Sequence, residues 1–296
     1  MKQQVYAFKK ILGFILVSTF LVSCNKDNST EDNPLFVELQ DATIAYQTYG
    51  SGEPLLMCMG YASNMDSWGT EAIERLQQNY KVIVFDYRGM GYSTNSANSF
   101  TINTLAEDLN QMLVALKINK THVLGWSMGG FVAQMFAINH PEKINKLVLY
   151  ATNCGDTTAV NPSQEIIEIL SNPSSTPMEL LGTLFPDDWL ATHPEPWTFL
   201  PDVKEPYNGQ TIGIQYEAVQ MWLSPGGGSY GRLNELTMPV LLICGDQDKV
   251  VPWINSSILA ESISTSTLIK VNDTGHGMMY QVPETFAGYV LSFLRD

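Results

Sequence analysis

One serine in this sequence stands in a setting that suits nucleophilic chemistry. Ser127 is the centre of a Gly-x-Ser-x-Gly motif at 125–129, between a predicted strand over 121–124 and a predicted helix over 128–139. Glycines two residues away on either side allow a turn that is too sharp for side chains at those positions. Such a turn lifts the hydroxyl above the carboxyl end of the strand, and the N-terminus of the helix faces any negative charge that develops there. The context therefore predicts a serine nucleophile.

A serine hydroxyl attacks well only when a histidine accepts its proton, and a carboxylate then fixes the tautomer of that histidine. The chain has four histidines. His276 is the candidate, because it stands between two glycines directly after the last predicted strand. Loops at the carboxyl ends of parallel strands form the edge where ligands meet an open sheet. Of the other histidines, His122 lies within a predicted strand, His140 precedes a proline, and His193 lies in the middle stretch of the chain.

The carboxylate is also expected in a loop that follows a strand, and three aspartates meet this condition. Asp248 has the offset that we favour, three residues after a glycine and four before the proline that begins the next helix. Asp246 stands against the strand end, where an aspartate caps or braces a turn. Asp156 follows the preceding strand and is the third candidate. We predict Asp248 as the partner of His276.

Acyl transfer also requires two backbone N–H groups that receive the oxyanion. One is expected from Met128, directly after the nucleophile, and the other from Tyr61, in the loop after an apolar strand. Met59, Trp126 and Met278 are candidate substrate-binding side chains, for which ordinary core packing is the alternative. No cysteine–histidine spacing resembles a metal site. Neither a metal nor an organic cofactor is implied.

Apolar strands and helices alternate along most of the chain. The predicted strands cover 36–39, 43–46, 55–59, 81–86, 121–124, 146–150, 240–244 and 267–271. The predicted helices cover 68–79, 101–116, 128–139, 254–262 and 283–294, and Thr101 is the expected cap of the second. This alternation predicts an α/β fold with a mostly parallel, doubly wound sheet of eight strands.

The alternation stops over 153–236, a stretch rich in proline and aromatic residues. A segment of this length is rarely a structureless loop, so it is predicted to form a small helical cap inserted after the sixth strand. The expected core then consists of 35–152 and 237–296.

The first 23 residues have the pattern of a secretory signal. Three lysines within 1–10 precede an apolar run over 11–22, which is too short to span a membrane. The ending Leu-Val-Ser-Cys resembles a bacterial lipobox, which would make Cys24 the lipidated first residue of the mature chain. An ordinary signal peptide with an incidental cysteine is the alternative. Residues 24–34 are polar and are expected to form a flexible tether.

The expected location follows from these features. The chain would be a membrane-anchored lipoprotein, periplasmic or at the cell surface. Asn25, which is not acidic, favours the outer membrane. A net charge of −14 argues against nucleic acid as a partner, because polyanions would be repelled. Cys58 and Cys244 lie within predicted strands and are expected to be buried small hydrophobes.

Together these motifs resemble the α/β-hydrolase superfamily, in its branch with a cap after the sixth strand, and the resemblance covers 35–296. The chain order serine, aspartate, histidine is also that of the family. The resemblance rests on Gly60, the Asp-Tyr-Arg-Gly-Met-Gly-Tyr-Ser segment at 86–93, the motif at 125–130, the segment 245–252, and Gly275 with His276. In that family the segment corresponding to 86–93 is structural.

One departure concerns the oxyanion loop. The family usually has His-Gly there, where the histidine supports the loop, and this chain has Met59-Gly60. A serine nucleophile argues against epoxide hydrolases and haloalkane dehalogenases, which use aspartate.

The expected activity is therefore that of a serine hydrolase that cleaves a small carboxylic ester through an acyl-enzyme. A C–C bond hydrolase or a cofactor-free perhydrolase would use the same triad. A peptidase of the proline-iminopeptidase type is disfavoured, because its acidic amine-binding cluster is not evident in the cap. From another class, the protein could be a non-catalytic ligand-binding surface lipoprotein. No pattern in the sequence indicates an oligomeric state.

Overall fold

The computed structural model describes residues 33–295, except 98, 173 and 205–207, and contains one sheet of eight strands in the order β1-β2-β4-β3-β5-β6-β7-β8. The predicted α/β fold is confirmed. The strands are β1 (Leu35–Glu38), β2 (Thr43–Tyr49), β3 (Glu53–Cys58), β4 (Tyr80–Phe85), β5 (Thr121–Trp126), β6 (Ile144–Tyr150), β7 (Val240–Gly245) and β8 (Ser266–Val271).

The direction of the strands decides where their loops meet. Strand β2 runs antiparallel to β1 and to β4, and the pairs from β4 through β8 are all parallel. The loops that follow β3, β5, β7 and β8 therefore emerge at one edge of the sheet. Every residue of β5 and of β7 is buried, as expected for strands that are covered on both faces.

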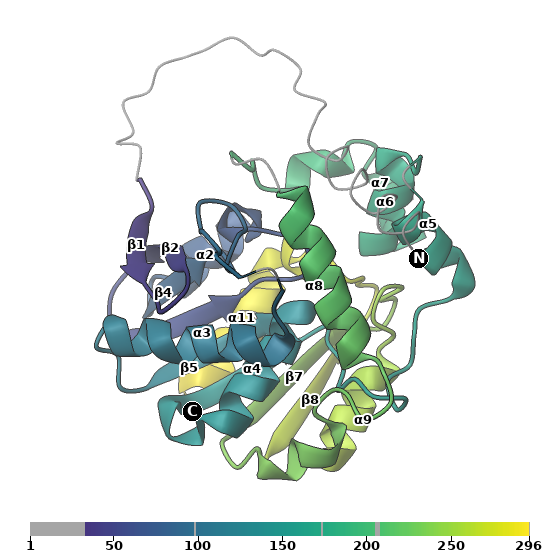
Figure 1. Ribbon diagram of the computed structural model, residues 1–296. Helices are drawn as coiled ribbons and strands as arrows, with labels where there is room; N and C mark the ends of the chain where they lie inside the picture. The colour runs from purple at the N-terminus through teal and green to yellow at the C-terminus, as the bar shows by residue number, and fades with distance from the viewer. Residues whose placement is uncertain (1–32, 98, 173, 205–207, 296) are drawn as a thin grey trace.

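Helices cover both faces of the sheet (Figure 1). Helix α3 (Ile102–Ala115) packs against α4 (Met128–Asn139) on one face, and α2 (Thr70–Leu76) packs against α11 (Pro283–Arg295) on the other. The cap predicted for α3 is present, since the side chain of Thr101 accepts a hydrogen bond from the amide of Thr104 at 3.2 Å. Helix α9 (Ile254–Ser262) contacts β7 and β8, and α10 (Met278–Gln281) precedes α11.

One predicted helix is interrupted. The helix expected over 68–79 is a 3-10 turn, η1 (Met65–Ser67), followed by α2. Trp68 has extended backbone angles, with φ −69° and ψ 137°, and Gly69 is the N-cap of α2. The indole of Trp68 is nevertheless buried, at 1% exposure, so its burial comes from the turn and not from a helix face.

The segment between β6 and β7 is helical. We call the helices of this insertion the cap: α5 (Gln164–Ser171), α6 (Pro177–Leu184), α7 (Asp187–Thr192), η3 (Pro196–Phe199), α8 (Gly209–Trp222) and η4 (Tyr230–Glu235). Local caps start three of these helices, because Ser163, Thr176 and Asn208 each accept a hydrogen bond from an amide of the first turn.

The two ends of the cap meet at one point. The amide of Ser229 donates to the carbonyl of Cys154 at 2.8 Å. Gly155 and Gly228 have φ of 69° and 75°, and a Cβ on either one would lie 2.7 Å from the Cα of the other. Glycine is required at both positions, because the backbone is left-handed and the two segments touch there.

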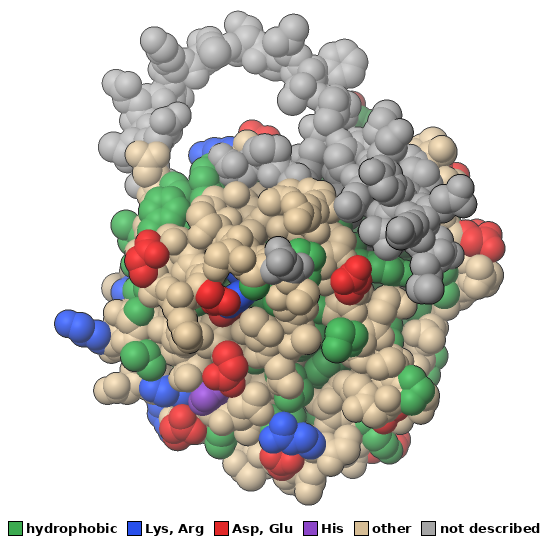
Figure 2. Space-filling view, in the orientation of Figure 1, with side chains coloured by type: hydrophobic (Ala, Val, Ile, Leu, Met, Phe, Trp, Pro, Cys, Tyr) green, Lys and Arg blue, Asp and Glu red, His purple; other side chains and the backbone are tan. Residues whose placement is uncertain are grey.

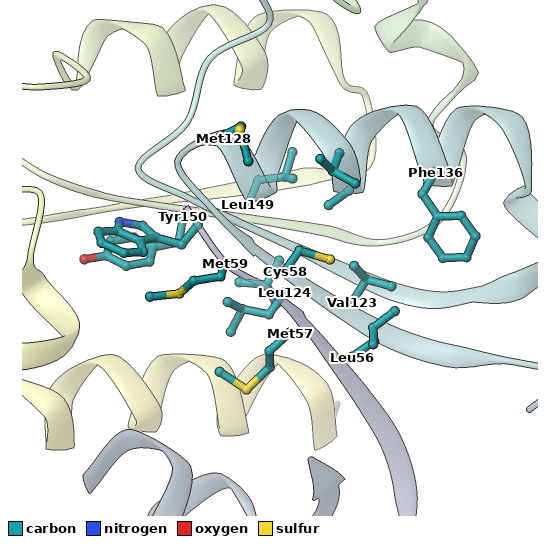
Figure 3. Close-up of a cluster of buried hydrophobic side chains, with 14 of the residues drawn as sticks. Leu56, Met57, Cys58, Met59, Val123, Leu124, Met128, Phe136, Leu149 and Tyr150 are labelled. Carbon is teal, nitrogen blue, oxygen red and sulfur yellow. The ribbon is translucent and has the colours of Figure 1, made fainter. Parts of the chain in front are cut away.

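The hydrophobic core extends through both layers around the central strands. Figure 3 shows part of it, with buried side chains of β3, β5, β6 and α4 drawn as sticks. As predicted, Cys58 and Cys244 are buried and free, and so is Cys154. Burial raises the pKa of the Cys244 and Cys154 thiols to about 11 each, so neither is a thiolate at neutral pH.

The surface carries scattered charges. Asp and Glu side chains are spread over the face shown in Figure 2 and do not form one patch. No helix among the described residues has the length and apolar character needed to cross a membrane. The predicted signal segment 1–23, Cys24 and nearly all of the predicted tether over 24–34 lie outside the described residues.

A buried arginine ties together three separated segments. Arg88 is 2% exposed, and its guanidinium donates to Asp108 of α3 at 2.7 Å and to Asp41, in the β1–β2 turn, at 2.9 Å. Burial raises the pKa of the Asp108 carboxyl, whereas the hydrogen bond from Arg88 lowers the pKa of the more exposed Asp41. Arg88 therefore compensates a carboxylate that has little access to water.

Removal of this arginine is expected to destabilise the fold. Arg88→Met leaves the Asp108 carboxyl buried without its partner, so the free energy of unfolding should fall by about 3–5 kcal/mol. Chemical denaturation followed by circular dichroism measures this change. The control is Arg75→Met, which breaks a surface pair with Glu71 and should leave stability nearly unchanged. Equal stability of the two variants would contradict the structural role of Arg88.

Candidate active site

Ser127 occupies a strained turn between β5 and α4. Its backbone angles are φ 55° and ψ −121°, a region that residues other than glycine rarely adopt. Such strain costs on the order of 1–3 kcal/mol and persists only where the surroundings impose it. A Cβ at Gly125 would collide with the carbonyl oxygen of Gly129, and a Cβ at Gly129 would collide with that of Cys58. The two motif glycines are therefore required by backbone contact.

The main chain on both sides of the serine is fixed by hydrogen bonds. The Ser127 amide donates to the Tyr150 carbonyl at 3.0 Å, and the hydroxyl of Thr152 donates to the Ser127 carbonyl at 2.8 Å. Within the segment 121–130, Ser127 is the one residue that is not fully buried. The turn thus holds the hydroxyl at a partly accessible position in an otherwise buried segment.

Two of the predicted triad residues are in direct contact. Asp248 Oδ2 and His276 Nδ1 are 2.9 Å apart, and the two residues are 6% and 4% exposed. The other carboxylate oxygen of Asp248 accepts the amides of Val250 and Val251, at 2.9 and 2.8 Å. The carboxylate is thus held on both oxygens. It can fix the imidazole as the tautomer that carries its proton on Nδ1, which leaves Nε2 free to act as a base.

The histidine is fixed beside the serine turn. Its backbone carbonyl accepts the Trp126 indole N–H at 3.2 Å and the Tyr150 hydroxyl at 2.6 Å. The Trp126 and His276 rings are 5.3 Å apart between centroids. Since Trp126 is the residue before the nucleophile, the structure brings Asp248, His276 and the Ser127 turn together in one place.

The two segments that carry the predicted oxyanion donors lie at the serine. Met128 is the first residue of α4, so its amide has no acceptor within the helix. On the other side, a Cβ added to Gly60 would lie 3.5 Å from Ser127 Cβ and 3.2 Å from the Trp126 ring, so the loop after β3 lies against the nucleophile. Tyr61 follows in this loop.

The remaining histidines lie apart from this site. His122 pairs with Glu53 at 3.0 Å, near the start of β5 and therefore at the opposite edge of the sheet. His140 pairs with Glu107 of α3 at 2.9 Å. His193 stacks on Trp189 in the cap, with ring centroids 4.0 Å apart. Each of these side chains therefore has a local structural partner.

The two alternative aspartates have other surroundings. Asp156 accepts the amides of Thr157 and Gly226, at 2.6 and 3.2 Å, and so links the two ends of the cap. The amide of Asp246 donates to Val271, while its Oδ1 is buried without a partner among the described residues. The structure pairs neither of them with a histidine.

The predicted substrate-binding side chains are buried in the core. Met59, Trp126 and Met278 are at most 6% exposed, and Trp126 supports the backbone of His276. A cavity of about 490 Å³ lies between α5, α6 and the loop after β7, and Asp248 and Lys249 are among its lining residues. The Lys249 ammonium donates to the Gly182 carbonyl at 3.0 Å and to Asp187 at 2.7 Å. These two hydrogen bonds connect the cap to the loop after β7, which carries Asp248.

Several supporting residues escaped the sequence analysis. Tyr150 ends β6 and Thr152 follows it by two residues, and they hydrogen-bond to the backbone carbonyls of His276 and Ser127. Gln281 accepts the Gly275 amide at 3.1 Å and donates to the Asp273 carbonyl at 2.6 Å, so it closes the loop that carries His276. The signal that could have indicated Gln281 is that it is a polar residue within the otherwise apolar segment 278–282 before the final helix.

The chemistry available to this arrangement is acyl transfer. A partly accessible hydroxyl, an imidazole held by a carboxylate and a helix N-terminus lie at the same edge of the sheet. Among the described residues, no three histidine, cysteine, aspartate or glutamate side chains lie close enough together to hold a metal ion.

Similarity to known proteins agrees with this geometry. A family model described as the alpha/beta hydrolase fold matches residues 53–185. A poly(3-hydroxyalkanoate) depolymerase from Ectopseudomonas oleovorans is 28% identical over 82% of this chain and 84% of its own length. The 3-oxoadipate enol-lactonase 2 of Acinetobacter baylyi is 26% identical over 83% of this chain and 91% of its own.

A solved structure of a hydrolase is also similar to this chain in sequence and in fold. A hydrolase from Pseudomonas aeruginosa is 26% identical, covers 90% of this chain and 99% of its own, and superposes with a TM-score of 0.73. With the sheet order and the serine turn described above, these similarities assign the chain to a class of enzymes. The chain has the α/β-hydrolase fold, and its relatives and structural neighbours are hydrolases of that class.

Proposed function

We propose that this α/β-hydrolase cleaves a small carboxylic ester through a covalent acyl-enzyme on Ser127. The observation that carries the proposal is the 2.9 Å contact between Asp248 and His276, made beside a serine whose backbone is held at φ 55°. A paired imidazole and a strained, partly accessible serine are the two parts that general base and nucleophilic catalysis require.

The proposed reaction has two halves. Ser127 Oγ attacks the ester carbonyl while His276 Nε2 takes the hydroxyl proton, and the amides of Met128 and Tyr61 receive the oxyanion. His276 then gives this proton to the leaving alcohol as the C–O bond breaks. A water molecule, deprotonated by the same imidazole, attacks the acyl-enzyme and releases the carboxylic acid and the free serine.

The choice of ester cleavage rests on the names of two relatives, a poly(3-hydroxyalkanoate) depolymerase and an enol-lactonase, because the other reactions would use the same triad. A C–C bond hydrolase, a perhydrolase and a non-catalytic binder are the outcomes against which the proposal is tested.

The nucleophile is tested with a fluorophosphonate probe. Ser127 Oγ would attack phosphorus and displace fluoride, so the wild type should be labelled and Ser127→Ala should not. Ester turnover should fall by at least about 10⁴-fold in the same variant. Mass spectrometry of the labelled peptide and a panel of short and long acyl esters, amides and vinylogous diketones measure these outcomes.

Each alternative gives a distinct result in this experiment. Labelling with turnover of diketones and not of esters identifies C–C hydrolysis, and labelling with peracid formation from acetate and hydrogen peroxide identifies a perhydrolase. No labelling of the folded wild type would favour the non-catalytic binder and would overturn the proposal.

The acid is tested with three matched variants. Asp248→Asn removes the charge that fixes and stabilises the His276 imidazole, so kcat should fall by about 10³–10⁴-fold with little loss of stability. Asp246→Asn and Asp156→Asn make the same change at the alternative positions and should alter kcat by less than about 5-fold. Steady-state kinetics on one ester compares all three. A larger loss in either control than in Asp248→Asn would reassign the acid.

We also propose that the chain is anchored to a bacterial membrane by lipid on Cys24. The support is the basic and apolar start of the sequence, followed by Leu-Val-Ser-Cys at 21–24. In a bacterial host that is fed an alkyne fatty acid, the wild type should carry the label and sediment with membranes. Cys24→Ser should abolish the label, and Asn28→Ser in the same segment should not. A labelled Cys24→Ser protein would contradict the proposal.

A further inference from the structure

The loop that carries the second oxyanion donor is bound by a helix of the cap. The Ala62 amide donates to Gln215 Oε1 at 2.8 Å, and the Tyr61 hydroxyl donates to the Ile212 carbonyl at 3.3 Å. Gln215 and Ile212 both belong to α8, more than 150 residues further along the chain. The oxyanion loop is therefore hydrogen-bonded to the cap through the backbone amide of Ala62 and through the side chain of Tyr61.

The loop requires such a support. Ala62 has φ 55°, in the left-handed region, although it is not a glycine. A residue of this kind keeps its conformation only where the surroundings impose it. Ala62 and Gln215 are both 0% exposed, so water does not replace the side-chain oxygen of Gln215 as the acceptor of this amide.

The usual support is missing from the sequence. Where related enzymes have a histidine before the glycine of this loop, this chain has Met59, which is 0% exposed and is one of the buried core side chains in Figure 3. A thioether has no N–H to donate and is a weak acceptor, so Met59 does not reproduce the hydrogen bonds of a histidine. The buried amide of Gln215 is the polar group that contacts the loop instead.

We propose that Gln215 is a positioning residue for the oxyanion hole. Its side-chain carbonyl holds Ala62, and thereby sets the direction of the preceding Tyr61 amide toward the oxyanion that forms on the substrate of Ser127. The oxyanion hole is then complete only when α8 is seated on the loop. The inference rests on the proposed serine hydrolase function and adds to it the residue that replaces the missing histidine.

The side chain offers a matched pair of variants. Because Oε1 accepts from Ala62, Nε2 faces away from this amide, and it is buried without a partner among the described residues. Gln215→Glu therefore keeps an oxygen that accepts from the Ala62 amide, whether the new carboxyl is protonated or not. The change also costs no hydrogen bond of Nε2, since Nε2 makes none within the described part of the chain. Gln215→Met has nearly the same length and removes the acceptor.

The experiment measures the rate of serine modification by a fluorophosphonate, which forms a charged oxygen on phosphorus in the oxyanion hole. In Gln215→Met the maximal rate kinact should fall by about 10–100-fold, less than the 10²–10³ that follows outright loss of a donor. The half-saturating probe concentration should change by less than about 3-fold. Gln215→Glu should restore most of kinact. Thr211→Val, on the same helix and also buried, should behave as the wild type.

Inhibition by an alkyl trifluoromethyl ketone gives a second measure, because the bound hemiketal carries a full oxyanion. Gln215→Met should weaken this inhibitor by a factor similar to its loss in kinact. If Gln215→Met does not fold, as judged by circular dichroism, Gln215→Asn keeps the amide but withdraws it from the loop, and the same losses are expected.

A folded Gln215→Met with wild-type kinact would overturn the inference, and so would a Gln215→Glu variant that is as impaired as Gln215→Met. The failure of the proposed function looks different, because the wild type itself would then not be labelled.

Discussion

The left-handed backbone of Ser127 is the constraint on which the rest of the site depends. The turn brings the end of β5, the start of α4 and the end of β3 so close together that no side chain fits between them. The carbonyl of Cys58 consequently lies against Gly129. The same approach places Gly60 against the nucleophile and puts the start of α4 beside the loop after β3. The neighbouring strand β6 then supplies the hydrogen bonds that stabilise a turn which is unfavourable on its own.

Position along the sheet explains why much of the site could be predicted from sequence. Parallel strands end at one edge, so residues in the loops after β5, β7 and β8 become neighbours whatever their separation in the chain. The periodic apolar runs gave most strands and helices of the core to within a few residues. The exception over 68–79 arose because Gly69 interrupts a stretch whose apolar spacing is helical.

Contacts between the cap and the core could not be predicted in this way. The bounds of helix α8 were not predicted, because polar residues interrupt its apolar ones. Which side of this helix is buried depends on how it packs on the core. Gln215 stands between Ile212 and Trp222 on the buried side of that helix, a polar residue among buried neighbours, which is the signal that could have drawn attention to it. For Met59 and Met278 the limit is different, since an apolar residue fits a core and a pocket equally well.

The meeting of the two cap ends at Gly155 and Gly228 has an evolutionary consequence. Because the chain closes on itself where Gly155 touches Gly228, the segment between these glycines can lengthen, shorten or be exchanged without moving any strand. Such a change would leave the nucleophile in place. A newly acquired module must still bring a hydrogen-bond acceptor for the amide of Ala62, which restricts the inserts that yield a working descendant.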